Sequence, residues 1–290
     1  SAMVGKALNK ASFVKVESNE NILPNANHLK TDDEVLCPQE QISVEQKIQM
    51  ALDIERRLNA KDKVKNVPYN GVQDISSQRH IFSSAGLNAS TRSRMCASYA
   101  YALVEDGANN AMQGASQVSR LFSDLNASSV IDKTYEKCIG LLNGKPIPTK
   151  RYDVIFDTDT QSSVFGVFSM MFSGKAAKDG INPMRDKIGS VIADSQLTIY
   201  DHPLNTDGFG YHLFDAEGTP TVKSELMVEG CLQTLIHNSA TASYFDINTT
   251  GHASRGPKST LGVKLHQLEI AQGLESSSTL HSGEYLEVTD

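Results

Sequence analysis

The chain has 290 residues, of which 39% are hydrophobic and 21% are charged, so it is neither disordered nor fibrous and has the length of one or two domains. Its net charge of −7 argues against a nucleic-acid-binding surface, which needs clustered Lys and Arg. No apolar run approaches the ~20 residues of a membrane span. We therefore expect neither nucleic acid nor a membrane as a partner.

The first predicted elements are helical. Residues 1–10 resemble the end of a helix, and residues 18–42, rich in Asn with two Pro, predict a long irregular surface connection. Ser43 and Gln46 have the spacing of a capping box at the start of a second helix. Apolar residues then recur at helical spacing: Val44, Ile48, Ala51, Leu52 and Leu58. This pattern predicts an amphipathic helix that ends near residue 61.

The next segment predicts three antiparallel strands. A loosely alternating run over residues 72–82 and a longer one over 87–104 are separated by the turn sequence Ser83–Gly86. Glu105–Gly107 marks a second turn before the third strand. The strand face with small polar and basic side chains is predicted to face solvent: Ser90, Arg92 and Arg94.

A helix over about residues 128–142, capped by Asn143-Gly144, completes the predicted first domain. The link Lys145–Thr149 contains two prolines, which cannot continue a helix. We therefore place a domain boundary near residue 147. The prediction is an N-terminal α+β domain over residues 1–147 and a strand-rich C-terminal domain over residues 148–290.

The second part opens with a strand over residues 152–156 that looks buried, followed by an apolar helix over residues 162–172. Later strands are predicted over 190–200, 218–228 and 231–237. From residue 254 to the end the pattern fades into a polar tail. Helices and antiparallel strands in separate runs predict an α+β fold of two domains.

The four cysteines are widely spaced, without a C-x-x-C pair, which is typical of free thiols in a reducing compartment. The chain also shows no signal-peptide pattern, so we expect a cytoplasmic protein. A nucleophile elbow and a phosphate-binding glycine loop are both absent from the sequence. A Cys231–His237 pair stays open, although packing is the simpler interpretation of Cys231.

The sequence also lacks a recognisable metal-binding motif. The sequence contains no H-E-x-x-H, and successive histidines are at least ten residues apart. Histidines and carboxylates do crowd the second part of the chain: Asp201, His202, Asp207, His212, Asp215, Glu217, His237 and His252. A metal site assembled from them stays open, but without ligand spacing we predict hydrogen-bonded or surface histidines and no metal ligand in this chain.

Two polar loops are the candidate sites. Phe214–Pro220 holds Asp215, Glu217 and Gly218 between two strand patterns. A pair of carboxylates is suited to acid–base chemistry if burial raises one pKa. The alternative is a turn in which Asp215 accepts hydrogen bonds from nearby backbone and Gly218 takes a positive φ angle.

The second candidate loop, Thr249–Gly256, is polar and flanked by glycines. It contains Gly251, His252 and Arg255. The Arg255 guanidinium has the geometry to hold a peptide carboxylate with two hydrogen bonds. The alternative is a solvated loop charge. We assign no catalytic residue to either loop and treat both as candidate contacts for a peptide or a partner.

Several segments resemble the PmbA/TldE branch of the TldD/PmbA family, grouped with the U62 peptidases and long described as modulators of DNA gyrase. The resemblance covers most of residues 43–260 and rests on the order and spacing of its motifs. They are Ser98–Leu103, Lys145–Asp157, Asp186–Gly189, Asp201–Leu204, Phe214–Thr221, Glu229–Leu232 and Thr250–Arg255. Members of the family extend further at both ends, so both predicted domains are expected to be incomplete.

The resemblance implies a cytoplasmic metalloprotease system that cuts small or unfolded peptides. In it, a TldD-type subunit carries the zinc motif H-E-x-x-x-H on a helix and pairs with a PmbA/TldE-type subunit. In this chain the corresponding positions are Val167–Phe172, which offer no metal ligand and no general base. That helix looks suited to packing. Zinc is therefore expected in a TldD-like partner and not here.

The leading hypothesis is thus a PmbA/TldE-like subunit without its own zinc site, which shapes a peptide channel for its partner. One alternative is a metallopeptidase that acts alone with scattered ligands. Another is a non-enzymatic regulator or scaffold, as the gyrase description suggests. A homodimer and a heterodimer both fit, and the sequence specifies neither the peptide nor the partner.

Overall fold

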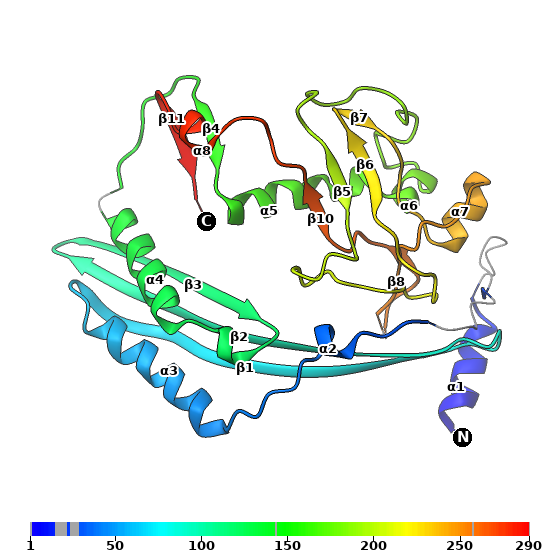
Figure 1. The fold of residues 1–290 in the computed structure, drawn as a ribbon, viewed down its shortest axis with the longest axis horizontal. Helices are drawn as coiled ribbons and strands as arrows, with labels where there is room; N and C mark the ends of the chain where they lie inside the picture. Colours follow the sequence, from blue (N-terminus) through cyan, green and yellow to red (C-terminus); the bar gives the residue numbers. More distant parts are fainter. Residues whose placement is uncertain (1, 15–21, 24–28, 143, 257, 290) are drawn as a thin grey trace. The chain divides into compact units, whose positions relative to one another are not determined.

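The computed structural model describes residues 2–14, 22–23, 29–142, 144–256 and 258–289 (Figure 1). It contains two compact units. Unit 1 comprises Ser1–Lys30, Ile81–Ala89 and Tyr152–Asp290, and unit 2 comprises Thr31–His80 and Ser90–Arg151. The predicted cap residue Asn143 and much of the predicted connection over 18–42 lie outside the described residues. The boundary near residue 147 stays a prediction.

Unit 2 follows the predicted order of elements. Its strands form one three-stranded sheet in the order β1-β2-β3, which confirms the predicted meander (Figure 1). The elements are α2 (Asp33–Leu36), α3 (Val44–Asn59), β1 (Val64–Phe82), β2 (Asn88–Asp106), β3 (Asn109–Ser119), η1 (Phe122–Asp124) and α4 (Ala127–Leu142). The tip of the β1–β2 hairpin, Ile81–Ala89, belongs to unit 1.

Helices α3 and α4 cover one face of this sheet. Ile54 of α3, Ala100 of β2 and Ile131 of α4 pack in one fully buried cluster. The capping box that starts α3 is present: Gln46 N–H donates to Ser43 Oγ, and Ser43 N–H donates to Gln46 Oε1. Hydrophobic periodicity and capping thus account for this layer, because each helix buries its apolar stripe on the alternating face of β2.

The prediction that Arg94 faces solvent is wrong. Its side chain is only 7% exposed. The guanidinium donates to both oxygens of Asp74 at 3.1 Å and to the carbonyl oxygen of Pro38 at 3.3 Å. Arg94, with Lys47, holds the pKa of Asp74 well below its ordinary value, because both cations hydrogen-bond to its carboxylate. The sequence pattern missed this ion pair because its partners lie 20 residues apart.

Unit 1 has much shorter strands. The elements are α1 (Ala2–Ala11), β4 (Asp153–Phe156), α5 (Thr158–Phe168), η2 (Ser169–Phe172), α6 (Gly174–Lys178), β5 (Ile199–Asp201), β6 (Ser224–Val228), β7 (Cys231–Leu232), α7 (Ser239–Phe245), β8 (Ala253–Ser254), β9 (Gly262–Val263), β10 (Leu268–Ile270), α8 (Ser277–Leu280) and β11 (Tyr285–Val288). Antiparallel neighbours form a four-stranded sheet in the order β10-β5-β6-β7. With the antiparallel sheet of unit 2, this confirms the predicted α+β class. The predicted strands over 190–200, 218–228 and 231–237 shrink to β5, β6 and β7.

Two expectations for unit 1 are wrong, and a third holds only in part. Strand β4 is mostly exposed instead of buried. The helix predicted over residues 162–172 is divided into α5, which buries none of its residues although Phe165 packs against the core of unit 1, and η2, whose Phe172 is buried in that core. The polar tail contains β10 and β11, and β11 pairs in parallel with β4. Strand pairing uses backbone groups, so a polar segment joins a sheet without an apolar pattern.

The core of unit 1 lies between the four-stranded sheet and α6. Ile199 of β5, Leu226 of β6 and Leu232 of β7 pack with Ala177 of α6. No helix in the described parts of the chain is both long and apolar enough to cross a membrane.

Candidate functional site

The tip of the β1–β2 hairpin packs on the first candidate loop. Leu87 and Ala89 form a buried cluster with Phe214, all within unit 1. Gly218 has a φ angle of +78°, and a Cβ there would lie 2.7 Å from Leu87 Cδ1. Glycine is therefore favoured at this position, both by the positive φ angle of the turn and by the close approach of the hairpin.

Asp215 organises this loop from within. Its side chain is 2% exposed. Oδ1 accepts the backbone N–H groups of Glu217 and Thr219, both at 2.9 Å, and Oδ2 accepts that of Ala253 at 2.9 Å. Burial raises the pKa of Asp215, while the three N–H donors oppose that rise. The structure matches the turn interpretation of Asp215 and Gly218, because every donor to the carboxylate is backbone.

Glu217 faces the start of α7. Its Oε2 accepts the N–H of Ser239 at 2.9 Å, and its Oε1 accepts the Ser239 hydroxyl. One carboxylate oxygen thus accepts a backbone N–H of the first turn of that helix, and the other accepts a side-chain hydroxyl. This arrangement ties the first candidate loop to α7.

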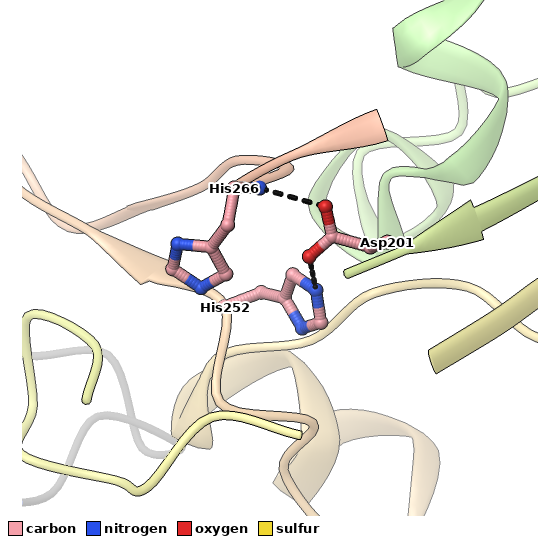
Figure 2. A group of neighbouring side chains, drawn as sticks. All are labelled: Asp201, His252 and His266. Atoms are coloured by element: carbon pink, nitrogen blue, oxygen red, sulfur yellow. Dashed lines mark hydrogen bonds and ion pairs between the residues drawn. The ribbon is translucent and has the colours of Figure 1, made fainter. Parts of the chain in front are cut away.

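The second candidate loop is held by buried polar groups. His252 is 1% exposed, and its Nε2 lies 2.8 Å from Oδ2 of Asp201 (Figure 2). Gly251 has a φ angle of +72°, and a Cβ there would lie 2.8 Å from the Pro220 carbonyl oxygen. Through the bond from Ala253 to Asp215, the two candidate loops are fixed to each other.

One group of side chains in the described part of the chain has metal-ligand geometry: Asp201, His252 and His266, with candidate atoms within 4.8 Å of one another (Figure 2). Each is already engaged. Asp201 Oδ1 accepts the N–H of His266 at 3.0 Å and of Gln267 at 2.7 Å. His266 Nε2 lies 2.8 Å from the carbonyl oxygen of Gly251, so it carries the proton. A cation would have to displace these bonds, so the residues fit a hydrogen-bonded network better than a resident zinc.

A cavity of about 560 Å³ lies beside these loops, within unit 1. It is lined by Ile22, Leu23, Ile81, Phe82, Ser83, Ser84, Leu87, Ala216, Glu217, Arg255, Thr260 and Leu261. The volume is in the range of small-ligand pockets, roughly 300–1,000 Å³. Of the six candidate residues, Glu217 and Arg255 line it.

The other four candidates hold the loops in place: Asp215, Gly218, Gly251 and His252. The apolar wall from the hairpin tip was not predicted as part of a site. The sequence pattern places Ile81 and Leu87 in strands, and no local pattern links them to residues more than 120 positions later. The pairing is a product of the tertiary fold.

Two family models match most of the chain. The PmbA/TldA metallopeptidase central domain matches residues 37–142, and the PmbA/TldA metallopeptidase C-terminal domain matches residues 149–290. A metalloprotease from Methanothermobacter thermautotrophicus is 32% identical over 126 residues, which cover 42% of this chain and 27% of that protein. A metalloprotease from Methanocaldococcus jannaschii is 22% identical over 73% of this chain and 47% of its own length. The chain thus spans less than half the length of these relatives.

Solved structures share the fold. A candidate modulator of a DNA gyrase from Thermotoga maritima has a TM-score of 0.82 and 23% identity, covering 94% of this chain and 61% of that one. TldE from Thermococcus kodakarensis has a TM-score of 0.81 and 20% identity, covering 96% of this chain and 63% of that one. At these identities the likeness establishes architecture.

Proposed function

This chain belongs to the TldD/PmbA family, and we propose that it acts there as a PmbA/TldE-like subunit of a cytoplasmic metalloprotease complex. In this proposal a TldD-like partner holds the zinc and cleaves peptides or unfolded protein. The present chain shapes the peptide channel and has no catalytic residue of its own.

The observation that carries the proposal is helix α5 with the η2 turn after it. The positions that resemble the zinc motif, Val167–Phe172, hold no His, Cys or carboxylate. Val167 is 77% exposed and Met170 is 46% exposed. Exposed apolar side chains clustered on a helix are typical of a surface that another protein covers. The helix is thus suited to contact a partner and unsuited to hold a metal.

The first experiment is reconstitution with the TldD-like subunit of the same organism, using a quenched fluorescent peptide. We expect cleavage only when both subunits are present, and zinc only in the partner after dialysis against metal-free buffer. Cleavage by this chain alone, with about one bound zinc that a chelator removes, would instead establish the stand-alone metallopeptidase. A chain that binds folded protein but never changes cleavage would establish the regulator.

The contact surface has its own test. A charge in an apolar interface is costly to bury, so Val167→Glu with Met170→Glu is expected to abolish co-purification with the partner. Leu274→Glu is the matched control, because Leu274 is 96% exposed and outside α5 and η2. Equal co-purification of both variants would remove α5 from the interface. Sedimentation of the chain alone separates a homodimer from a monomer that awaits its partner.

A further inference from the structure

We propose that one face of the β1-β2-β3 sheet in unit 2 binds an extended peptide segment whose side chains are apolar or aromatic and uncharged. This tyrosine face consists of the odd-numbered residues over 69–75 of β1 and 95–103 of β2, and the even-numbered residues over 112–118 of β3. The inference rests on the proposed role in peptide processing and names the class of peptide that this chain recognises.

The tyrosine face is opposite helices α3 and α4. Ala100 of β2 is fully buried in the cluster that contains residues of both helices. Successive side chains of a strand point to opposite faces, so Tyr99 and Tyr101 point away from the helices. Tyr101 pairs with Gly114 of β3, and the ring of Tyr99 lies beside Gly71 of β1. Alternate residues of all three strands therefore share this face.

The composition of the tyrosine face favours an uncharged ligand. None of its residues, all of which the structure describes, carries a formal charge, whereas 21% of the whole chain is charged. Its larger side chains are nevertheless exposed: Tyr69 at 62%, Met112 at 50%, and likewise Ile75, Tyr101 and Val118. Exposed apolar side chains gathered on one face are typical of a binding surface. A charged side chain buried against them would lose its hydration without gaining a partner.

The tyrosine rings are held in place before any ligand binds. A Cβ at Gly114 would lie 2.6 Å from Cδ1 of Tyr101, and a Cβ at Gly71 would lie 2.9 Å from the hydroxyl oxygen of Tyr99. Each ring thus occupies space that a side chain on the neighbouring strand would fill. The ring of Tyr69 meets that of Tyr101 edge to face, with centroids 6.4 Å apart and an angle of 88° between the planes. Fixed rings lose little conformational entropy on binding, so they are effective contacts for apolar groups.

The dimensions of the tyrosine face favour an extended segment over a folded partner. Three strands about 4.8 Å apart and about nine residues long give a strip of roughly 400 Å². A stable interface between folded proteins needs about 800 Å² from each side. An extended segment of about eight residues spans about 27 Å, which is close to the length of the strip. The face therefore matches a short extended peptide.

The test is a fluorescence titration of the 290-residue chain against a nonapeptide blocked at both ends, with a central Trp and apolar residues alternating with Ser. The chain contains no Trp, so Trp emission reports the peptide alone. We expect a blue shift that saturates, because the Trp ring leaves water. Two control peptides carry Glu or Lys in place of the apolar residues that flank the Trp, and we expect both to bind at least about tenfold more weakly.

Variants of the tyrosine face test which side chains carry the binding. Tyr69→Ser with Tyr101→Ser removes two rings and is expected to weaken binding of the uncharged peptide at least about tenfold. Tyr101→Phe retains the ring and is expected to retain the affinity. Tyr244→Ser is the matched control, because Tyr244 is exposed to a similar extent but lies on α7 in unit 1. Met112→Lys adds a charge at an exposed position and is expected to weaken binding as well, so it tests the face even where the double variant does not fold.

Equal binding of the uncharged, Glu and Lys peptides by the unaltered chain, or no binding of any of them, would overturn the proposal. So would an affinity that the double variant and Met112→Lys both leave unchanged. A dimer in sedimentation that Met112→Lys dissociates would assign the face to a second copy of the chain and would also overturn it. Cleavage by the reconstituted complex is measured separately, so each of these results is distinguishable from a failure of the subunit role.

Discussion

The two units satisfy the hydrogen-bonding groups of their backbone in different ways. In unit 2, strands of 11 to 19 residues pair their backbone N–H and C=O groups in long ladders of hydrogen bonds. Two helices bury their apolar stripes on this sheet. In unit 1, the described strands are two to five residues long. There the connecting loops rely on the buried carboxylates of Asp201 and Asp215, and on the half-buried carboxylate of Glu217, as hydrogen-bond acceptors for backbone N–H groups.

From this difference we expect substitutions to lower the stability of the fold more in some positions than in others. A buried N–H group without an acceptor costs free energy comparable to a lost hydrogen bond. In unit 2 backbone partners supply the acceptors along the ladder, and a side chain takes that role outside the ladder, where Glu40 accepts the N–H groups of Phe122 and Ser123. In unit 1 one carboxylate serves several N–H groups at once, so its loss affects a whole loop.

The largest effect is expected for Asp215→Ala. The change leaves the N–H groups of Glu217, Thr219 and Ala253 without their acceptor. At about 1–3 kcal/mol for each group, partly recovered by water, we expect the free energy of unfolding to fall by about 4 kcal/mol. Urea unfolding followed by circular dichroism measures it. Asp186→Ala is the control, because Asp186 is 92% exposed, and a similar loss in both variants would contradict the assignment.

A pH effect of similar size is expected from His237. Burial lowers its pKa to about 4, so the folded state holds it neutral while the unfolded state protonates near pH 6.5. The unfolded state therefore binds more protons between pH 6.5 and 4, and stability falls over that window by about 3 kcal/mol, with no further loss below it. Burial lowers the pKa of His266 as well, which adds in the same direction.

The measurement for His237 is urea unfolding at pH 7 and at pH 4.5. His237→Gln retains a hydrogen-bonding group near Thr241, whose hydroxyl lies 3.2 Å from His237 Nδ1, and removes the titration. We expect the difference between the two pH values to shrink in this variant. His281→Gln changes an exposed histidine and serves as the control. An unchanged pH dependence in His237→Gln would show that other groups carry it.

A smaller decrease in the free energy of unfolding is expected for Gly218→Ala. The substitution places a Cβ 2.7 Å from Leu87 Cδ1 at a φ angle of +78°. Strain at a positive φ angle and displacement of Leu87 together are expected to cost about 2 kcal/mol. The thermal unfolding midpoint measures the change. A midpoint equal to that of the unaltered chain would mean that the hairpin tip does not need this close approach.

The smallest expected effect is an increase in stability, caused by a substitution in unit 2. Gly140 lies in the last turn of α4, and an added Cβ there meets no atom within 4 Å. Gly140→Ala is expected to stabilise the protein by about 0.5–1 kcal/mol, because alanine loses less backbone entropy in a helix. The same unfolding experiment tests it, and destabilisation would indicate a contact that the geometry does not show.

The sequence accounted well for unit 2. The cap at Ser43, the turns after Phe82 and Asp106, and the helix over 127–142 are local features, and each appeared where its pattern predicted. It accounted poorly for unit 1. Strands β10 and β11 are only three and four residues long, too short for a clear pattern in a polar segment, and the pairing of β11 with β4 joins segments about 130 residues apart.

For the candidate site, the sequence identified the two loops and the turn role of Asp215, because Asp-x-x-Gly has a local backbone consequence. It did not predict the buried Asp201–His252 pair, the exposed apolar face of α5 or the hairpin tip beside Arg255. Only the tertiary structure decided these, because they depend on contacts between segments far apart in the chain. Periodicity and capping act within a few residues, whereas burial and electrostatic partners are set by the whole fold.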